Sequence, residues 1–270
     1  MNDFYKKCAT IAVSVFSFVL TVIPEDMFKC IKLLKNFSNG LNIIFNRTIL
    51  FLLFFLLTMI LYKICISMKW WRTIKGKNYT IVVRYKDIFK IKSCKKVIPF
   101  DECYTTEVGE APGEIKPTSI CGQYLTKYSD INVQELIEYA KLKSKGKSKY
   151  KNKDKYESGV LVPNQDYLLL SFAKLDKEGL GRMTRHELID CLALLWLEIN
   201  KHYGQQDVCI PILGSGITRM DDSMLMQQEL LDIIIASYKL SAAKIKKPNK
   251  LIIACKRAED FSLYKIGEYI

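Results

Sequence analysis

The sequence predicts a three-layer α/β domain over about residues 78–270, preceded by an amino-terminal hairpin of two transmembrane helices over residues 1–77. In the larger part, segments with strand character alternate with segments of helical periodicity. A glycine turn follows the apolar stretch Val208–Ile212, which is typical of a buried strand in an α/β sheet. In the smaller part, an apolar run at residues 48–68 is long enough to cross a bilayer.

The composition indicates an anionic partner and gives little support to a metal site. The 270-residue chain has a formal net charge of +13, which favours a nucleotide, a nucleic acid or a membrane surface. Its nine cysteines include no Cys-x-x-Cys pair, and only two histidines accompany them. We therefore expect no bound metal, and cysteines that remain reduced.

The second predicted span, Thr48–Met68, is about 21 residues long, which is the length of a transmembrane helix. Its centre has no polar face, and its single charge, Lys63, lies near one end, where the side chain can reach the interface. Basic and aromatic residues follow directly, as expected at a cytosolic membrane interface: Lys69, Trp70, Trp71 and Arg72.

The first predicted span, Cys8–Ile23, is shorter, at about 16 residues. A signal peptide is the alternative interpretation, because two lysines precede a short apolar core. No small-x-small cleavage site follows, however, and a second span comes soon after, so a hairpin is favoured. Basic residues precede the first span and follow the second, which predicts that both termini are cytosolic. The connector at 24–47 is expected to include an amphipathic helix at Met27–Phe45.

Two strands are predicted to open the α/β domain. Tyr79–Tyr85 is β-branched and aromatic, and Lys96–Phe100 is followed by Asp101 and Glu102. Paired acids at a strand end suit an acid/base couple, contacts to ligand hydroxyls or an exposed turn. Adjacent strand residues point in opposite directions, which weighs against the acid/base couple.

The middle of the chain is predicted to hold a loop at Thr105–Pro117, a short helix near Thr118–Leu125 and a helix at Ile131–Leu142. In Lys141–Lys155 every second residue is lysine, which predicts a solvated, disordered loop. The alternative is a tether to a membrane surface or to RNA.

A strand at Asp166–Leu175 precedes a segment that has the outline of a calcium-binding EF-hand loop. Leu180 occupies the fifth position of that outline and has no oxygen to offer calcium. Thr184 and Glu187 instead form a capping box for a helix at Arg185–His202.

The segment Val208–Arg219 reads as a strand, a glycine turn and the approach to a helix at Ser223–Leu240. Glycines let a backbone approach a phosphate, and N–H groups near a helix start bind its oxygens. Arg219 adds a cation. The alternative is a plain turn with an exposed arginine, because short glycine motifs are weak signals. A last strand, Leu251–Cys255, and a terminal helix complete the predicted elements.

Four segments, in this order and attached to a hairpin, resemble the macro-type domain of the membrane effectors of Thoeris antiphage systems. The resemblance covers nearly the whole chain and implies a macro-like domain with a mixed sheet that binds ADP-ribose and related nucleotides at its strand ends. The segments are Lys86–Phe89, Val97–Thr106, Ser119–Gln123 and Pro211–Arg219.

The resemblance also implies which residues bind the nucleotide. Asp87 takes the place of the acid that contacts the adenine amine, Leu213–Thr218 surround the diphosphate, and Arg219 closes that loop. Phe100, Asp101 and Glu102 fall where related domains hold the distal ribose. The full expected set is Asp87, Ile88, Phe100, Asp101, Glu102, Gly122, Gln123, Leu213, Gly214, Ser215, Gly216, Ile217, Thr218 and Arg219.

Two departures from the family pattern favour a sensor over a hydrolase. No Asn-Ala-Ala-Asn segment is present, and Lys86 stands where a glycine usually precedes the acid. The alternatives are an ADP-ribosyl hydrolase that uses Asp101 or Glu102, and a nucleic-acid tether that uses Lys141–Lys155.

The resemblance implies a function in antiviral defence. A partner TIR protein would make histidine-ADP-ribose or a related ADP-ribose derivative from NAD, and no cofactor is expected. Binding would drive the effector to self-associate and disrupt the membrane, which ends growth of the infected cell. We expect a multi-pass protein of the bacterial inner membrane with no specific nucleic-acid partner.

Overall fold

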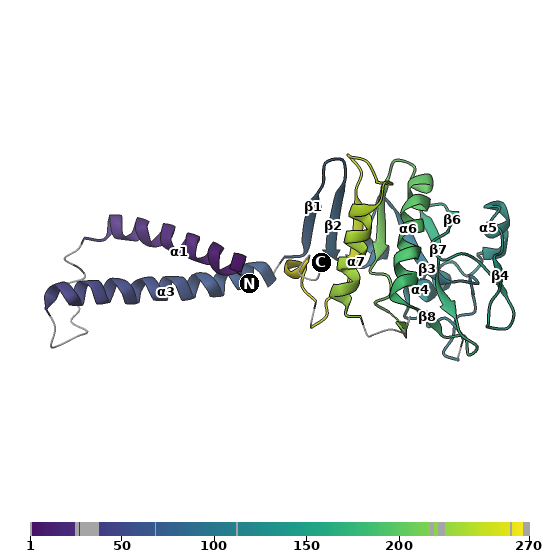
Figure 1. Cartoon of the computed structure of the whole chain (residues 1–270), viewed down its shortest axis with the longest axis horizontal. Helices are drawn as coiled ribbons and strands as arrows, with labels where there is room; N and C mark the ends of the chain where they lie inside the picture. The colour runs from purple at the N-terminus through teal and green to yellow at the C-terminus, as the bar shows by residue number, and fades with distance from the viewer. Residues whose placement is uncertain are drawn as a thin grey trace. The chain divides into compact units, whose positions relative to one another are not determined.

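The structure is a computed structural model that describes residues 2–24, 27, 38–67, 69–111, 113–216, 219–220, 225–259 and 261–266. The chain divides into two compact units, Met1–Lys69 and Trp70–Ile270 (Figure 1). The first is helical, and the second contains a large sheet with helices on both faces.

The first unit consists of two antiparallel helices, α1 (Asn2–Val22) and α3 (Asn39–Ser67). The ring of Phe4 lies 5.5 Å from that of Tyr62, and the ring of Phe16 lies 5.3 Å from that of Phe51, so the two helices pack as a hairpin.

Both helices are long and apolar enough to cross a membrane, over Phe4–Val22 (19 residues) and Asn39–Cys65 (27 residues). They exceed the predicted spans 8–23 and 48–68 because the helices continue through flanking polar residues. Of the predicted connector helix, residues 28–37 lie outside the described residues, and 39–45 belong to α3.

The second unit is built on a nine-stranded sheet in the order β1-β2-β11-β9-β3-β7-β8-β10, with β6 paired to β7. The strands β2, β11, β9, β3 and β7 are mutually parallel. β1 pairs antiparallel with β2, β6 and β8 pair antiparallel with β7, and β10 pairs parallel with β8. The mixed α/β sheet predicted from the sequence is confirmed. Its strands are β1 (Trp71–Lys75), β2 (Thr80–Tyr85), β3 (Cys94–Asp101), β6 (Leu161–Asn164), β7 (Tyr167–Leu175), β8 (Gly181–Met183), β9 (Asp207–Pro211), β10 (Arg219–Met220) and β11 (Leu251–Cys255).

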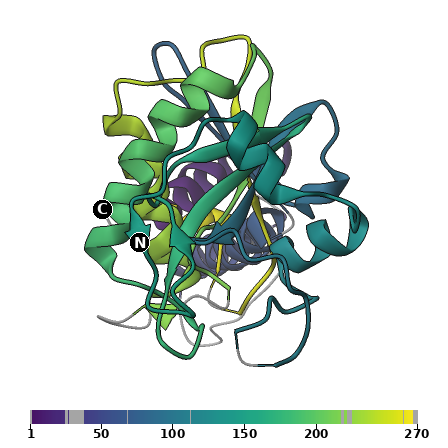
Figure 2. The ribbon, with the colours of Figure 1, turned by 90° about the vertical axis from the view of Figure 1, so that its right-hand side faces the viewer.

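Helices cover both faces of this sheet and make three layers (Figure 2). On one face lie α6 (Arg185–His202) and α7 (Gln227–Leu240), and on the other lie α4 (Ile120–Lys127) and α5 (Val133–Tyr139). Side chains alternate between the layers along each strand. Val97 and Leu168 pack toward α6 and α7, whereas their chain neighbours Ile98 and Leu169 pack toward α4 and α5.

The first strand, β1, begins before the predicted start of the domain and includes Trp71 and Arg72, which were predicted to lie at a membrane interface. Trp71–Lys75 pairs along its whole length with β2. The reason is local, because a tight turn at Gly76 returns the chain directly onto the neighbouring strand. The compact unit therefore starts at Trp70, before the expected boundary at residue 78.

The lysine-rich segment is ordered, so the prediction of a disordered loop is wrong. It forms a hairpin of β4 (Gly146–Lys147) and β5 (Asp154–Lys155). Alternation places most lysines outward, while Ser148 and Tyr150 are buried on the inner side. Burial of these two residues offsets the repulsion among the lysines, of which Lys145, Lys147 and Lys153 also form ion pairs with acids.

Some of the remaining elements match the predictions, and the terminal helix differs from them. The capping box of Thr184 and Glu187 opens α6 as predicted. Residues 105–111 and 113–117 form a loop with one isolated bridge between Val108 and Ile115. In place of the predicted terminal helix, the described residues after β11 hold a short 3-10 helix, η2 (Leu263–Lys265).

Candidate functional site

The candidate site is the edge of the sheet at which the parallel strands end. Segments 86–88, 256–257, 212–216 and 102–106 follow β2, β11, β9 and β3, respectively. Because these strands are parallel neighbours, the four segments leave the sheet at one edge, in that order. Ligands of open α/β sheets bind outside this edge. We call it the carboxyl edge.

Asp87 lies at the carboxyl edge, in a tight turn directly after β2. It caps the 3-10 helix η1 (Ile88–Lys90), where its Oδ1 accepts a hydrogen bond of 2.9 Å from the Phe89 N–H. Ile88 is 3% exposed and holds the turn in the core, while Asp87 is exposed. The turn thus presents an ordered carboxylate to solvent.

The glycine segment Ile212–Gly216 follows β9 at the same edge. Ile212 and Leu213 are buried, Gly214 has a φ of +82°, and the Ser215 hydroxyl donates to the Ile212 carbonyl at 2.7 Å. A Cβ built on Gly216 meets no atom of the described part of the chain within 4 Å. The backbone at Gly216 therefore faces open space, which suits the approach of a phosphate.

The rest of the predicted phosphate loop lies largely outside the described residues. This holds for Ile217, Thr218 and the side chain of Arg219. The backbone of Arg219 and Met220 forms β10, which pairs parallel with β8. The place of the Arg219 cation stays a prediction.

Glu102 and Phe100 hold the fold around the end of β3. Phe100 is buried against Tyr104 and Tyr124. Glu102 is 4% exposed and accepts hydrogen bonds from the Ser148 hydroxyl at 2.6 Å and from the Leu175 N–H at 3.3 Å. Both side chains are engaged in the interior, and their contacts with a ligand stay a prediction.

Asp101 organises the turn after β3. Its Oδ1 accepts hydrogen bonds from the N–H groups of Cys103 at 2.8 Å and Thr105 at 3.2 Å. Burial raises the pKa of the Asp101 carboxyl above its ordinary value, although these two hydrogen bonds act in the opposite direction. The carboxylate is thus committed to backbone donors, as in a structural turn.

Gly122 and Gln123 belong to the packing and surface of α4. A Cβ on Gly122 would lie 2.2 Å from the Lys116 carbonyl oxygen, so this glycine permits close approach of the helix to the preceding loop. Gln123 is exposed and donates through Nε2 to the Thr118 carbonyl at 2.9 Å. These contacts explain both residues without a ligand.

Two residues that the sequence analysis did not select, Lys256 and Arg257, also lie at the carboxyl edge. They follow β11, which lies between β2 and β9. The Arg257 guanidinium lies 4.7 Å from the ring centre of Trp70 and 5.1 Å from that of Tyr85. No sequence signal places them there, because their position depends on the strand order.

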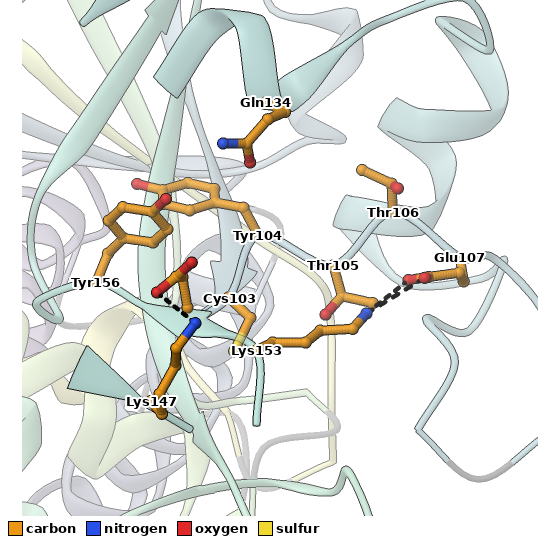
Figure 3. Close-up of a pocket in the computed structure, with 10 residues that line it drawn as sticks. Cys103, Tyr104, Thr105, Thr106, Glu107, Gln134, Lys147, Lys153 and Tyr156 are labelled. Atoms are coloured by element: carbon orange, nitrogen blue, oxygen red, sulfur yellow. Dashed lines mark hydrogen bonds and ion pairs between the residues drawn. The ribbon is translucent and has the colours of Figure 1, made fainter. Parts of the chain in front are cut away.

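A polar cavity of about 330 Å³ lies beyond β3, beneath the lysine hairpin (Figure 3). Two ion pairs line it, Lys153 with Glu107 at 3.2 Å and Lys147 with Asp154 at 3.0 Å. Burial raises the pKa of the Cys103 thiol in its wall to about 11, so this thiol is neutral at physiological pH and unsuited to nucleophilic attack.

We expect Asp101→Asn to preserve the turn, because the Asn Oδ1 can accept both backbone hydrogen bonds. Folding raises the pKa of Asp101, so its ionised form costs stability above the folded-state pKa. That cost vanishes as the pH falls toward the unfolded value of about 3.9. The melting temperature of Asp101→Asn should therefore exceed that of the parent by the largest margin at neutral pH. The two melting temperatures should converge in acid. Thermal melts from pH 7 to pH 3.5 measure this, and an advantage that grows in acid would contradict it.

Comparisons with known proteins agree with this architecture. Residues 81–256 match the family model described as Thoeris protein ThsA, Macro domain. Over 209 residues the chain is 30% identical to Thoeris protein ThsA of Bacillus amyloliquefaciens (strain Y2), which covers 73% of this chain and 70% of that protein.

Solved structures similar to this chain include the Oceanobacillus iheyensis macrodomain with ADP, with a TM-score of 0.45, 11% identity and coverage of 74% of this chain and 92% of that one. Another is Thermosipho africanus DarTG in complex with ADP-ribose, with a TM-score of 0.43, 11% identity and coverage of 72% and 46%. On the match to the family model and the identity to its curated relative, the chain belongs to the Thoeris ThsA family of macro-domain proteins.

Proposed function

We propose that this protein is a membrane-anchored Thoeris effector that binds an ADP-ribose-derived signal nucleotide at the carboxyl edge. One observation carries the proposal. In a chain of the ThsA macro-domain family, Asp87 and the glycine segment Ile212–Gly216 lie at the same edge of a parallel sheet. The two are separated by β11 alone in the strand order, and two strand spacings, about 10 Å, suit a base at one end and phosphates at the other.

The chemistry of the two segments suits the two ends of such a ligand. Asp87 is an exposed acceptor for an amino group of the base. The described residues leave open space beside the Cα of Gly216, where phosphate oxygens would accept from nearby backbone N–H groups. Arg219 would supply a further cation, and the net charge of +13 favours an anionic ligand.

The first unit would hold the protein in a membrane as a multi-pass hairpin. The apolar side chains of α3, such as Leu52, Leu53 and Leu56, are at least half exposed, which suits contact with lipid. We propose the bacterial inner membrane, with both termini in the cytoplasm. The signal, histidine-ADP-ribose or a related derivative, would come from a partner TIR protein.

Activation would be self-association that disrupts the membrane and ends growth of the infected cell. The ligand must bind the assembled state more tightly than the unassembled one, because equal affinities would leave the equilibrium unchanged.

The sensor proposal includes binding without turnover. The two carboxyl groups that a hydrolase would use are both engaged, Glu102 by Ser148 and Leu175 and Asp101 by two backbone N–H groups. A catalytic base must reach the attacked proton, and Glu102 is only 4% exposed. The hydrolase alternative is therefore the weaker one.

Titration calorimetry of the full chain in detergent micelles tests this proposal, with ADP-ribose, NAD and histidine-ADP-ribose as ligands and chromatography of each afterwards. We expect saturable binding of an ADP-ribose derivative that is recovered intact. Recovery of a cleaved product would assign the protein to the hydrolases, and no heat with any of the three would overturn the proposal.

The lysine hairpin does not favour a nucleic-acid tether. Lys145, Lys147 and Lys153 form ion pairs with Glu157, Asp154 and Glu107, which lowers the charge that they offer to phosphates. We expect weak binding to arbitrary oligonucleotides. Tight binding that falls steeply with salt would support the tether instead.

A further inference from the structure

The chain after β11 begins at the carboxyl edge and is tied to the helix that follows the glycine segment. We call residues 256–259 and 261–266 the C-terminal strap. The Gln227 Nε2, in the first residue of α7, donates to the Lys256 carbonyl at 3.2 Å. The Ser262 N–H donates to Oε1 of Gln228, which is 1% exposed, at 3.1 Å. The strap is thus fixed at two points to the start of α7.

The other end of the strap holds β1, the strand closest in sequence to the apolar helices. Arg72 Nη1 donates to the carbonyls of Leu263 at 2.9 Å and Tyr264 at 2.7 Å. The Phe261 and Leu263 side chains are 6% and 5% exposed, so the strap is seated in the core. A displacement of the strap would therefore be passed to β1.

Arg257 joins the carboxyl edge to the first residue of the second unit. Its guanidinium lies over the rings of Trp70 and Tyr85, at 4.7 and 5.1 Å. The Tyr85 N–H also donates to the Trp70 carbonyl at 2.9 Å. Tyr85 is opposite Cys255 at the paired ends of β2 and β11, and Asp87 follows it by two positions.

Within the described residues, these contacts connect segments at the carboxyl edge and the start of α7 with Trp70 and Arg72, which are close in sequence to α3. One route runs from Asp87 through Tyr85 and Arg257 to Trp70. The other runs from α7 through the strap to Arg72. In sequence, Met68 and Lys69 alone separate Trp70 from the end of α3.

We propose that the C-terminal strap and the stack of Trp70, Arg257 and Tyr85 relay nucleotide binding at the carboxyl edge to the membrane helices. The relay rests on the proposed function. Ligand binding energy shifts a distant equilibrium only through elements that respond to both sites. If the stack is removed, the carboxyl edge can bind its ligand without moving Trp70, the first residue of the domain after the membrane helices.

The test separates nucleotide binding from membrane disruption in the full chain. Variants Trp70→Ala and Arg257→Lys remove one ring or the planar guanidinium, and the latter keeps the charge. Lys265→Ala, which removes an exposed cation of the same strap outside the stack, is the matched control. Affinity for histidine-ADP-ribose and for ADP-ribose is measured in detergent, and dye release is measured after reconstitution into lipid vesicles.

We expect unchanged affinity in Trp70→Ala and in the Lys265→Ala control, and the dye release of Arg257→Lys is compared with its own measured affinity. In Trp70→Ala and Arg257→Lys, the nucleotide concentration for half-maximal dye release should rise about 5- to 150-fold, the usual range of allosteric coupling. The double variant should be no worse than the more affected single one, because both substitutions interrupt one connection. The control should behave as the parent.

Three results would overturn the relay. An unchanged concentration for dye release shows that the stack transmits nothing, and an equal loss of affinity shows that Arg257 is a ligand contact. Dye release without nucleotide shows that the stack restrains the membrane helices and does not transmit nucleotide binding to them. A parent chain that binds neither nucleotide would overturn the proposed function, and the relay with it.

Discussion

Replacing Gly216 with valine is expected to abolish nucleotide binding while the domain stays folded. A Cβ on Gly216 meets no atom of the residues that the structure describes within 4 Å, so we expect the fold to accommodate the valine, which would occupy the space proposed for the phosphates. Blocking two N–H groups from a charged ligand costs about 1.5–3 kcal/mol for each hydrogen bond, or on the order of 100-fold or more in affinity. Calorimetry measures the loss, and a thermal melt shows whether the fold is retained.

A matched substitution shows whether the effect is local. Gly40, in α3 of the first unit, likewise has no atom of the described residues within 4 Å of a built Cβ. Gly40→Val should keep most of the affinity. Full affinity in Gly216→Val would remove the glycine segment from the site. Arg219→Ala should lower affinity in the same direction if the predicted cation closes the phosphate loop.

The Glu102→Ala variant is expected to release the lysine hairpin and destabilise the domain by about 2–4 kcal/mol, because buried donors lose their acceptor. These donors are the Ser148 hydroxyl, which anchors the hairpin, and the Leu175 N–H at the end of β7. Trypsin cleaves after lysine, so released strands β4 and β5 should be cut much faster than in the parent. Timed proteolysis and thermal melting measure the two effects.

Two further variants serve as controls for the Glu102 prediction. Glu102→Gln retains an acceptor and should lose less stability than Glu102→Ala, whereas Glu110→Ala removes an exposed carboxylate and should change neither measurement. Unchanged proteolysis in Glu102→Ala would contradict the anchoring role. Loss of an ADP-ribosyl hydrolase activity without loss of stability would restore Glu102 as a catalytic candidate.

The central strands of the sheet were predictable from the sequence, whereas the short and outer strands were not. The strands β2, β3, β7, β9 and β11 are buried in a parallel core, so they read as apolar or β-branched runs. Strands β6, β8 and β10 are short and lack such a pattern. The first strand, Trp71–Lys75, has a composition that also suits a membrane interface. Its pairing with β2 shows that it is a strand of the sheet.

The candidate site was predictable where it depends on local chemistry. A glycine turn after a buried strand and an acid in a tight turn can be recognised in the sequence, and both lie at the carboxyl edge. The roles of Glu102 and Gly122 depend instead on distant or space-filling partners, the Ser148 hydroxyl and the Lys116 carbonyl. Arg257 enters the edge through the strand order alone.

The lysine run shows a second limit of sequence reasoning. Charge density predicts repulsion and solvation, but every other residue of the run also faces inward when the chain is extended. Burial of Ser148 and Tyr150 and the bond to Glu102 outweigh the repulsion. Residue 102 is 46 positions away from residue 148, so no local pattern reveals it.

A crystal structure of residues 70–270 with a bound ADP-ribose derivative tests the central claim most directly. The account predicts the adenine beside Asp87, the diphosphate on the backbone near Gly216, and an intact bond between the distal ribose and its substituent. A nucleotide bound in the polar cavity beneath the lysine hairpin, with the carboxyl edge left free, would contradict it.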